Sequence, residues 1–312
     1  MNVKIYDSRD FPAYLPKLNL LYDDLFTGGK GFRAKLIQMI SADLSLNERG
    51  IQLLSQTIEF IHNASLLHDD LIDRSSLRRG KTTAWLKYTP EYAVLAGDYL
   101  LARVMVNLSA YGNIRLVQYT SQVISDLLEG EWIQDSLVRD FSVVPDQLDR
   151  VHNLKTASLF KWCLRSPFLV KEKYDESLHS LLEEMGSLLG ILFQRSDDLL
   201  DFDVRNHEGK AILGDLKSGY LNSFAAFLTE HLTVEEKKKF ITSQSLGELI
   251  GVVGEEKYKS LVEKFDSMNS GLIRLYQHHL TALEEMLEGS EKKLVEKLRP
   301  LPDLLYWRKE PK

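Results

Sequence analysis

The chain contains one acidic pattern twice, at positions far apart in the sequence. Both copies have the form D-D-x-x-D, at residues 69–73 and 197–201. Residues four apart share a helix face, so Asp69 and Asp73 are predicted to point the same way, as are Asp197 and Asp201. Carboxylates gathered on an apolar helix repel one another and lose hydration, so they are best tolerated around a strong positive charge. Mg²⁺ is typically held by a few carboxylates together with substrate phosphates. The repeated motif therefore predicts a metal cluster that binds a polyphosphate.

The helix that ends in the first motif has one polar face and one apolar face. At about 100° per residue, His62 and Ser65 fall on the same side as Asp69 and Asp73. The apolar face is formed by Phe60, Ala64, Leu67 and Leu71. A solvated surface helix has the same pattern, so the first motif alone leaves both a surface and a site open.

The second motif follows a pair of glycines on its own helix face. Gly186, Gly190 and Gln194 precede Asp197 on this face. A glycine inside a helix costs about 1 kcal/mol relative to alanine, so two of them indicate a close approach of something to the helix. A bound ligand and tight helix–helix packing explain the glycines about equally well. Packing does not explain the carboxylates that continue the same face.

Basic residues lie in segments that could supply the cations for a polyphosphate. They are Lys30, Arg33, Arg78, Arg79, Lys81, Lys155 and Lys210. Lys30 and Arg33 border a glycine-rich entry into a helix, where backbone N–H groups also favour anions. Each basic residue alone is also typical of a solvated surface. In a chain of net charge −6, their position beside the acidic motifs favours a phosphate pocket.

Helical periodicity dominates the chain after residue 33, and no alternating β-branched run predicts a sheet. Asn47 and Asp146 are predicted to begin the helices that follow them. The predicted helices span residues 31–44, 48–72, 91–110, 113–137, 145–164, 174–203, 220–230, 234–246, 254–265 and 268–289. No Pro- or Ser-rich linker separates the two halves. We therefore predict a single all-α domain over residues 1–312, with helices around a deep central cavity that both motifs face.

The composition and net charge of the chain argue against several classes of protein. A net charge of −6 argues against a general binder of nucleic acid or anionic membranes. Cys163 is the only cysteine, which excludes an internal disulfide, and we expect it to be a small buried side chain beside Trp162. The first 16 residues show no signal peptide, and no apolar stretch reaches the length of about 18 residues that spans a bilayer. These features predict a cytoplasmic protein without stable membrane insertion.

Several segments together resemble the trans-isoprenyl diphosphate synthases of the polyprenyl synthetase family. The matching segments are GGKGFR (28–33), EFIHNASLLHDDLID (59–73), RRGKTT (78–83), GDYLLA (97–102), GEWIQ (130–134), KTASLF (155–160), FQRSDDLLD (193–201) and GKAILGDL (209–216). The resemblance implies the isoprenoid synthase type I fold, a homodimer and three Mg²⁺ ions per active site with the bound diphosphate. It also implies a prenyltransferase of isoprenoid biosynthesis that joins an allylic diphosphate head-to-tail to isopentenyl diphosphate.

The resemblance implies roles for individual residues by matching position. Asp69, Asp73 and Asp197 would hold the Mg²⁺ ions, and Asp70, Asp198 and Asp201 would assist as ligands or supporting groups. The allylic diphosphate would be bound by Arg78, Lys155 and Lys210. Isopentenyl diphosphate would be bound by Lys30, Arg33, His62 and Arg79. Thr156 and Gln194 would flank the allylic carbon skeleton.

The chain departs from the family pattern at a few positions. Tyr220 stands where a lysine is usual, and Arg195 stands where an aliphatic residue is common. Compensation for the missing lysine charge is predicted to come from Lys217 or Arg195. Ala64 and Ser65, shortly before the first motif, are small where bulky aromatics limit the product to about C15, which predicts a product of C20 or longer.

Three other protein classes remain open from the sequence. A non-catalytic prenyl-diphosphate-binding partner subunit would use the same pocket, but it has no need of the intact acidic motifs and cations. A class I terpene cyclase normally replaces the second DDxxD with an Asn/Ser/Glu-type triad, which this chain lacks. A helical structural protein is the third class, and it leaves both motifs unexplained.

Overall fold

The computed structural model describes residues 9–20, 31–78, 80–204 and 212–308. The predicted site residues Lys30, Arg79 and Lys210 lie outside these ranges. The chain divides into two compact units, each of which is described by itself below. The first comprises Met1–Ile124 and Trp162–His179, and the second comprises Ser125–Lys161 and Ser180–Lys312.

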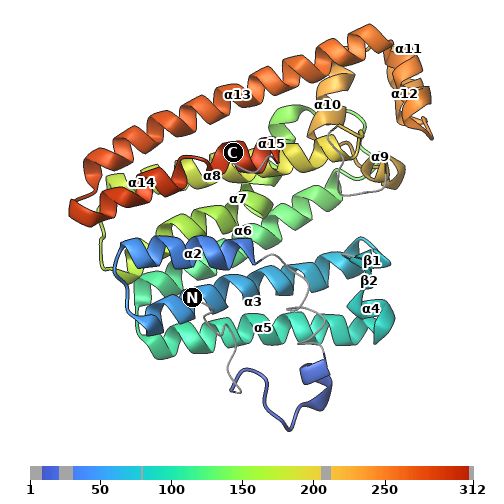
Figure 1. Ribbon diagram of the computed structural model, residues 1–312. Helices are drawn as coiled ribbons and strands as arrows, with labels where there is room; N and C mark the ends of the chain where they lie inside the picture. Colours follow the sequence, from blue (N-terminus) through green and yellow to red (C-terminus); the bar gives the residue numbers. More distant parts are fainter. Residues whose placement is uncertain (1–8, 21–30, 79, 205–211, 309–312) are drawn as a thin grey trace. The chain divides into compact units, whose positions relative to one another are not determined.

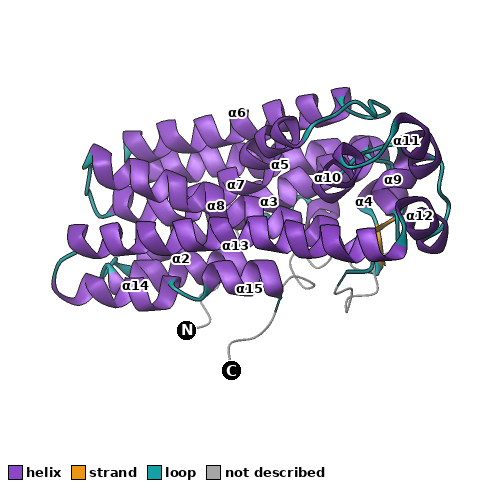
Figure 2. Cartoon of the chain, turned by 90° about the horizontal axis from the view of Figure 1, so that it is seen from above, coloured by secondary structure: helices purple, strands orange, loops and turns teal. Residues whose placement is uncertain are grey.

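The described chain is built almost entirely from helices, so the all-α prediction is confirmed (Figure 2). The longer helices are α2 (Phe32–Asp43), α3 (Glu48–Ile72), α5 (Pro90–Tyr111), α6 (Ile114–Ser136), α7 (Pro145–Val170), α8 (Glu176–Leu200) and α13 (Glu255–Met286). The shorter ones are α4 (Ala84–Lys87), α9 (Gly214–Ser218), α10 (Ser223–Glu230), α11 (Val234–Ile241), α12 (Leu246–Val253), η1 (Gly289–Lys292), α14 (Lys293–Leu298) and α15 (Leu301–Trp307). The one sheet among the described residues pairs β1 (Leu77–Arg78) with β2 (Lys81–Thr82) in antiparallel register.

The helix predictions are confirmed for the long amphipathic segments and wrong in part of the second half. The helix predicted at 48–72 has these same ends. The predicted break between residues 265 and 268 does not exist, because α13 is continuous through it. Phe265, Asn269 and Ile273 form one buried stripe across this point, and packing outweighs the weak helix preference of Asp266 and Ser267. The short elements β1, β2, α4, α9, α12, α14 and α15 have no counterpart among the predicted helices.

In the first unit, α3 lies between α2 and α5 (Figure 1). The side chain of Asn47 accepts a hydrogen bond from the Gly50 N–H at 2.8 Å, which confirms the predicted start of α3. Gly97 of α5 lies directly against the ring of His68, because a Cβ at this position would be 2.3 Å from His68 Nε2. The packing of α3 against α5 therefore fixes the last turns of α3, which contain the first acidic motif.

By length and composition, α5 is apolar enough to cross a membrane, so the expectation that no segment has this property is wrong. Core helices of soluble proteins share the property, and it does not by itself place α5 in a bilayer. Only 33% of its apolar window is buried inside the described chain. Leu95, Ala102 and Val106 are exposed and share one side of the helix.

In the second unit, α7 and α8 pack unusually close together. A Cβ on Gly190 would lie 2.2 Å from the Cα of Ala157, and a Cβ on Gly186 would lie 2.5 Å from the Cα of Lys161. Of the two explanations that the sequence left open for these glycines, the structure supports helix–helix packing. The glycines thereby bring the α8 face that leads to the second acidic motif against α7.

Gly190→Ala is expected to lower the free energy of unfolding by about 1–3 kcal/mol, since the new methyl group must push backbone away from backbone. This loss outweighs the gain in helix preference of about 1 kcal/mol. The matched control is Gly251→Ala in α12, where a Cβ would meet no atom within 4 Å, and it should be neutral or stabilising. Chemical denaturation of both variants checks the prediction, and equal stability of the two would contradict it.

Candidate active site

The first acidic motif occupies the end of α3. Asp69 is half-buried and Asp73 is exposed at the helix C-cap, where its N–H donates to the Asp69 carbonyl. Asp70 is only 6% exposed. Its Oδ1 accepts from Arg78 Nε at 2.8 Å. The two accessible carboxylates thus lie one helical turn apart, while Asp70 holds Arg78 of strand β1.

Arg33 and His62 lie side by side in the first unit. Arg33 Nη1 lies 3.4 Å from His62 Nε2, with Arg33 in the first turn of α2 and His62 in α3.

Cys163 is fully buried, as predicted, and burial raises the pKa of its thiol. The thiol is therefore neutral and has no role as a nucleophile.

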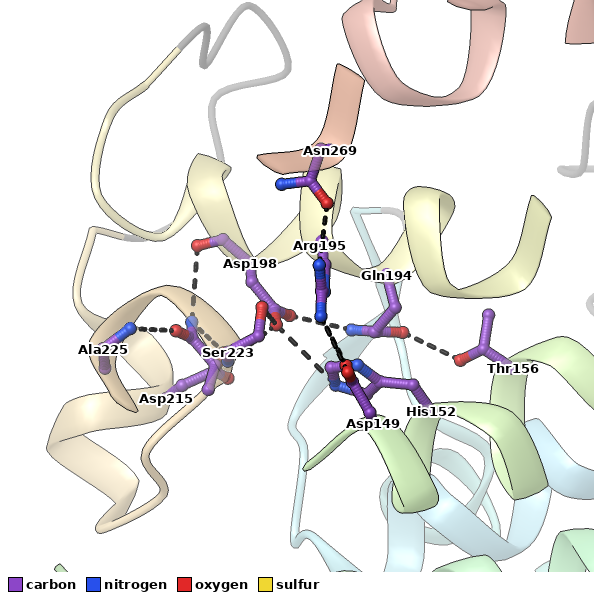
Figure 3. A network of polar contacts seen from close by, with 11 residues as sticks. Asp149, His152, Thr156, Gln194, Arg195, Asp198, Asp215, Ser223, Ala225 and Asn269 are labelled. Atoms are coloured by element: carbon purple, nitrogen blue, oxygen red, sulfur yellow. Dashed lines mark hydrogen bonds and ion pairs between the residues drawn. The ribbon is translucent and has the colours of Figure 1, made fainter. Parts of the chain in front are cut away.

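The second acidic motif occupies the end of α8, and its first two carboxylates have different environments. Asp197 Oδ1 accepts from Arg308 Nη2 at 2.6 Å, and its side chain is 30% exposed. Asp198 is buried at 3% exposure. Its Oδ2 accepts from the Ser223 N–H at 2.9 Å and from the Ser223 hydroxyl (Figure 3). Burial raises the pKa of Asp198 to about 6, although the Ser223 and Gln194 hydrogen bonds oppose the shift.

Asp201, the last residue of the second motif, is bound at the N-terminus of α9. Its Oδ1 accepts from the Gly214 N–H at 2.6 Å, and its Oδ2 has no hydrogen-bond partner within the described ranges. Burial and the nearby Asp215 raise the pKa of Asp201 to about 7. A buried carboxylate oxygen without a donor is a suitable ligand or acceptor for a cationic group.

A chain of hydrogen bonds joins α7 to the second motif (Figure 3). Thr156 Oγ1 donates to Gln194 Oε1 at 2.9 Å, and Gln194 Nε2 donates to Asp198 Oδ1 at 3.0 Å. His152 Nε2 lies 3.8 Å from Asp198 Oδ2, and burial lowers the pKa of His152 to about 4, so its ring is neutral. The predicted residues Thr156 and Gln194 are thereby brought together and oriented.

Lys155 points to an acidic partner in the same unit. Its ammonium forms an ion pair with Glu131 of α6, and both side chains are mostly buried. Gly130, in the family-like GEWIQ segment, makes room for it, because a Cβ there would lie 2.8 Å from Lys155 Cγ. The lysine is therefore held in a fixed direction by packing and by charge.

Asn222 and Ser223 support the site, although the sequence did not identify them as functional. Asn222 Oδ1 accepts from the Ala225 N–H and caps α10, while its Nδ2 donates to Asp215 Oδ2 at 3.0 Å. Ser223 holds Asp198, as described above. An Asn-Ser pair before an apolar helical run is an N-cap signal. The sequence therefore contains the signal for the start of α10, but this signal does not predict that Ser223 also binds the carboxylate of Asp198.

The departures from the family pattern have structural explanations. Arg195 is buried, and its Nη2 donates to both carboxylate oxygens of Asp149 at 2.8 Å while its Nη1 donates to Asn269 Oδ1 at 3.0 Å. Arg195 therefore neutralises Asp149, and its replacement of the missing lysine charge stays a prediction. Lys217 is exposed, and its Nζ lies 3.2 Å from the Ile212 carbonyl. Tyr220 is partly buried, and burial raises its pKa, so it is a neutral phenol.

Within the ranges that the structure describes, no three His, Cys, Asp or Glu side chains gather as a metal-binding cluster. Each acidic motif nevertheless offers carboxylate oxygens, which are the ligands that hard divalent cations take. Mg²⁺ usually retains water and substrate oxygens, so one or two carboxylates per motif suffice. Within the second unit, the partly exposed Asp197 and the unpaired Asp201 Oδ2 are donors that fit a divalent cation, and within the first unit the partly exposed Asp69 is such a donor.

The sequence of this chain is similar to the sequences of one known protein family. The family model described as Polyprenyl synthetase matches residues 16–249. A decaprenyl-diphosphate synthase of Dictyostelium discoideum is 36% identical over 212 residues, which are 67% of this chain and 46% of that protein. The chain thus spans about half the length of this relative.

Solved structures share the fold over nearly the whole chain. A decaprenyl diphosphate synthase from Rhodobacter capsulatus has a TM-score of 0.84 at 26% identity, covering 96% of this chain and 92% of that one. A polyprenyl synthase from Caulobacter crescentus, in complex with calcium and isoprenyl diphosphate, has a TM-score of 0.74 at 23% identity. The latter match covers 95% of this chain and 89% of that one. The helices therefore have the isoprenoid synthase fold.

Proposed function

This chain belongs to the polyprenyl synthetase family, and from that premise we propose that it is a trans-prenyltransferase. It condenses isopentenyl diphosphate with an allylic diphosphate and releases a longer all-trans polyprenyl diphosphate for isoprenoid biosynthesis. The observation on which the proposal depends is the construction of the second DDxxD motif. Asp198 is held by Ser223 and Gln194, and Asp197, the adjacent carboxylate, is left partly exposed.

Mg²⁺ is the proposed cofactor, with three ions per active site. Asp69, Asp73 and Asp197 would hold the ions, and Asp70, Asp198 and Asp201 would support them through the contacts described above. The calcium and isoprenyl diphosphate bound by the Caulobacter relative support a divalent-metal site for a diphosphate. When bound, the metal neutralises the charge of the diphosphate leaving group.

The cations of the chain complete the diphosphate sites in this proposal. Arg78, Lys155 and Lys210 bind the allylic diphosphate, while isopentenyl diphosphate is bound by Lys30, Arg33, His62 and Arg79. Arg78 and Lys155 are already oriented by Asp70 and Glu131, so their heads need little reorganisation when an anion arrives. The Arg33 guanidinium and the His62 ring, 3.4 Å apart, can donate to the same phosphate.

The reaction needs no nucleophilic side chain. Breaking of the allylic C–O bond gives a carbocation, which the double bond of isopentenyl diphosphate attacks. A proton is then lost to the released diphosphate. The Gln194 amide oxygen and the Thr156 hydroxyl present dipoles that stabilise the cation. The reaction requires an apolar pocket that excludes the water that would quench this cation.

A product of C20 or longer is part of the proposal. Ser65 is half-buried on the polar face of α3, and Ile58 lies further along the same helix. Neither residue has an aromatic ring that would close the path of a growing chain. The decaprenyl synthases among the related proteins make long products according to their names, which supports the same direction.

One assay tests the proposed function against its alternatives. The purified chain is incubated with Mg²⁺, isopentenyl diphosphate and a C5, C10 or C15 allylic primer, and the products are separated by chromatography. Elongated prenyl diphosphates support the proposal, and cyclic hydrocarbons indicate a terpene cyclase. Tight primer binding without any product would identify a non-catalytic partner subunit and contradict the proposal.

A homodimer in the cytoplasm is the proposed state of the protein. The exposed apolar side of α5, with Leu95, Ala102 and Val106, suits burial against a second copy. A single all-α domain is part of the same proposal, because the family model extends across both units. Sedimentation equilibrium of the parent and of Leu95→Lys checks the dimer. We expect the parent to be a dimer and the variant to dissociate, and a monomeric parent would contradict the proposal.

A further inference from the structure

Arg308, the residue that follows α15, forms an ion pair with Asp197 of the second acidic motif. Arg308 Nη2 lies 2.6 Å from Asp197 Oδ1, and the side chains are 18% and 30% exposed, respectively. The two residues are 111 positions apart in the sequence, so the contact depends on the tertiary structure of the second unit. An arginine in this position shields the same carboxylate that a divalent cation would use.

Contacts with Ser196 and Phe193 also hold the guanidinium. Arg308 Nε donates to Ser196 Oγ at 3.0 Å, and the Ser196 hydroxyl in turn donates to the Tyr306 carbonyl at 2.7 Å. The guanidinium carbon also lies 5.7 Å from the centre of the Phe193 ring. These contacts can persist when Asp197 is released, so the arginine head can give up one partner without leaving the site.

The backbone of Arg308 supports the same interpretation. Its φ of 52° and ψ of 27° lie in the left-handed region, which is unfavourable for a residue with a side chain. The conformation ends α15 and turns the side chain back toward α8. Contacts of the arginine head with α8 therefore offset the cost of this turn.

We propose that Arg308 is an internal counter-cation of the metal site: it holds Asp197 while no divalent cation is bound, and it must yield this carboxylate when one binds. The inference rests on the proposed function, because it takes Asp197 as a metal-binding residue. Competition between the guanidinium and the metal lowers the affinity for free metal.

Binding of Mn²⁺ alone to the full chain, measured from the electron paramagnetic resonance signal of the free ion, tests the inference without catalysis. Arg308→Gln is expected to bind Mn²⁺ about five-fold more tightly than the parent, because the competing charge is gone. The matched control is Arg299→Gln, which removes an arginine that pairs with Glu296 in the same unit, and it should bind Mn²⁺ as the parent does.

A second comparison separates competition at Asp197 from a loss of fold. In an Asp197→Asn background, Arg308→Gln should no longer change Mn²⁺ affinity, because the carboxylate for which the two cations compete is absent. Arg308→Lys keeps the charge but not the forked geometry, and it should fall between parent and Arg308→Gln. Thermal unfolding shows whether each variant is folded.

The outcomes distinguish this inference from the proposed function. Mn²⁺ binding that needs Asp197 but is unchanged in both Arg308 variants would overturn the counter-cation and leave the prenyltransferase proposal intact. Mn²⁺ binding that is insensitive to Asp197→Asn, or undetectable in the parent, would overturn the counter-cation as well, since no metal would then compete for that carboxylate. The synthase assay reports separately on the proposed function.

Discussion

Replacing Asp69 or Asp197 with asparagine is expected to lower turnover by about 100- to 1,000-fold while the helical fold is retained. Asparagine keeps the shape of the side chain but removes the negative charge that a divalent cation needs. Both carboxylates are partly exposed and stand at the ends of α3 and α8, so their replacement leaves the buried packing unchanged. Steady-state rates at saturating Mg²⁺ and substrates give the measurement, and circular dichroism verifies the fold.

The control for this prediction is an exposed carboxylate outside both motifs. Glu285 of α13 is exposed, and Glu285→Gln should retain the turnover of the parent. If the Asp69 and Asp197 variants both stayed within a few-fold of the parent, the carboxylates would not hold a catalytic metal. The proposed mechanism would then be wrong.

Ser65→Phe is expected to shorten the main product by at least one C5 unit. Ser65 lies about one helical turn before Asp69 on the half-buried side of α3, where its hydroxyl donates to the His62 carbonyl. A phenyl ring there would reach into the space next to the first motif and stop the growing chain earlier. Chromatography of the products from parent and variant gives the comparison.

Ala64→Phe is the informative contrast to Ser65→Phe. Ala64 is completely buried, so a phenyl ring at this position must displace packed neighbours and should lower the melting temperature. Ser65→Phe should shorten the product with a much smaller loss of stability. A parent enzyme that already stops at C15, or an unchanged product distribution in Ser65→Phe, would refute the model of pocket depth.

Local sequence signals determined a large part of the fold. The 3.6-residue periodicity located α3 and α8, because burial of one apolar face is the main source of stability for such helices. Asn47 fixed the start of α3 through a hydrogen bond made within four residues. The i, i+4 spacing likewise indicated that Asp69 and Asp73 share a face, since this relation is a property of any helix.

The role of each carboxylate depended on contacts with distant residues. Asp70 and Asp198 are the second residues of their motifs, and both are turned inward, where Arg78 and Ser223 hold them. Helical spacing predicts that these two carboxylates lie on a different face from the other carboxylates of their motifs. It does not predict which residue of another element binds them. The partner is set by the packing of another element against the motif.

The sequence by itself determined the class of fold, the family and the carboxylates that could bind a metal, because these depend on residue type and helical spacing. Only the tertiary structure decided that Gly190 serves the packing of α7 against α8, that α13 is one continuous helix, and that Arg308 neutralises Asp197. The physical reason is that steric fit and charge pairing act between side chains that meet in space. Which side chains come into contact depends on how the whole core packs, and a short stretch of sequence contains no information about this packing.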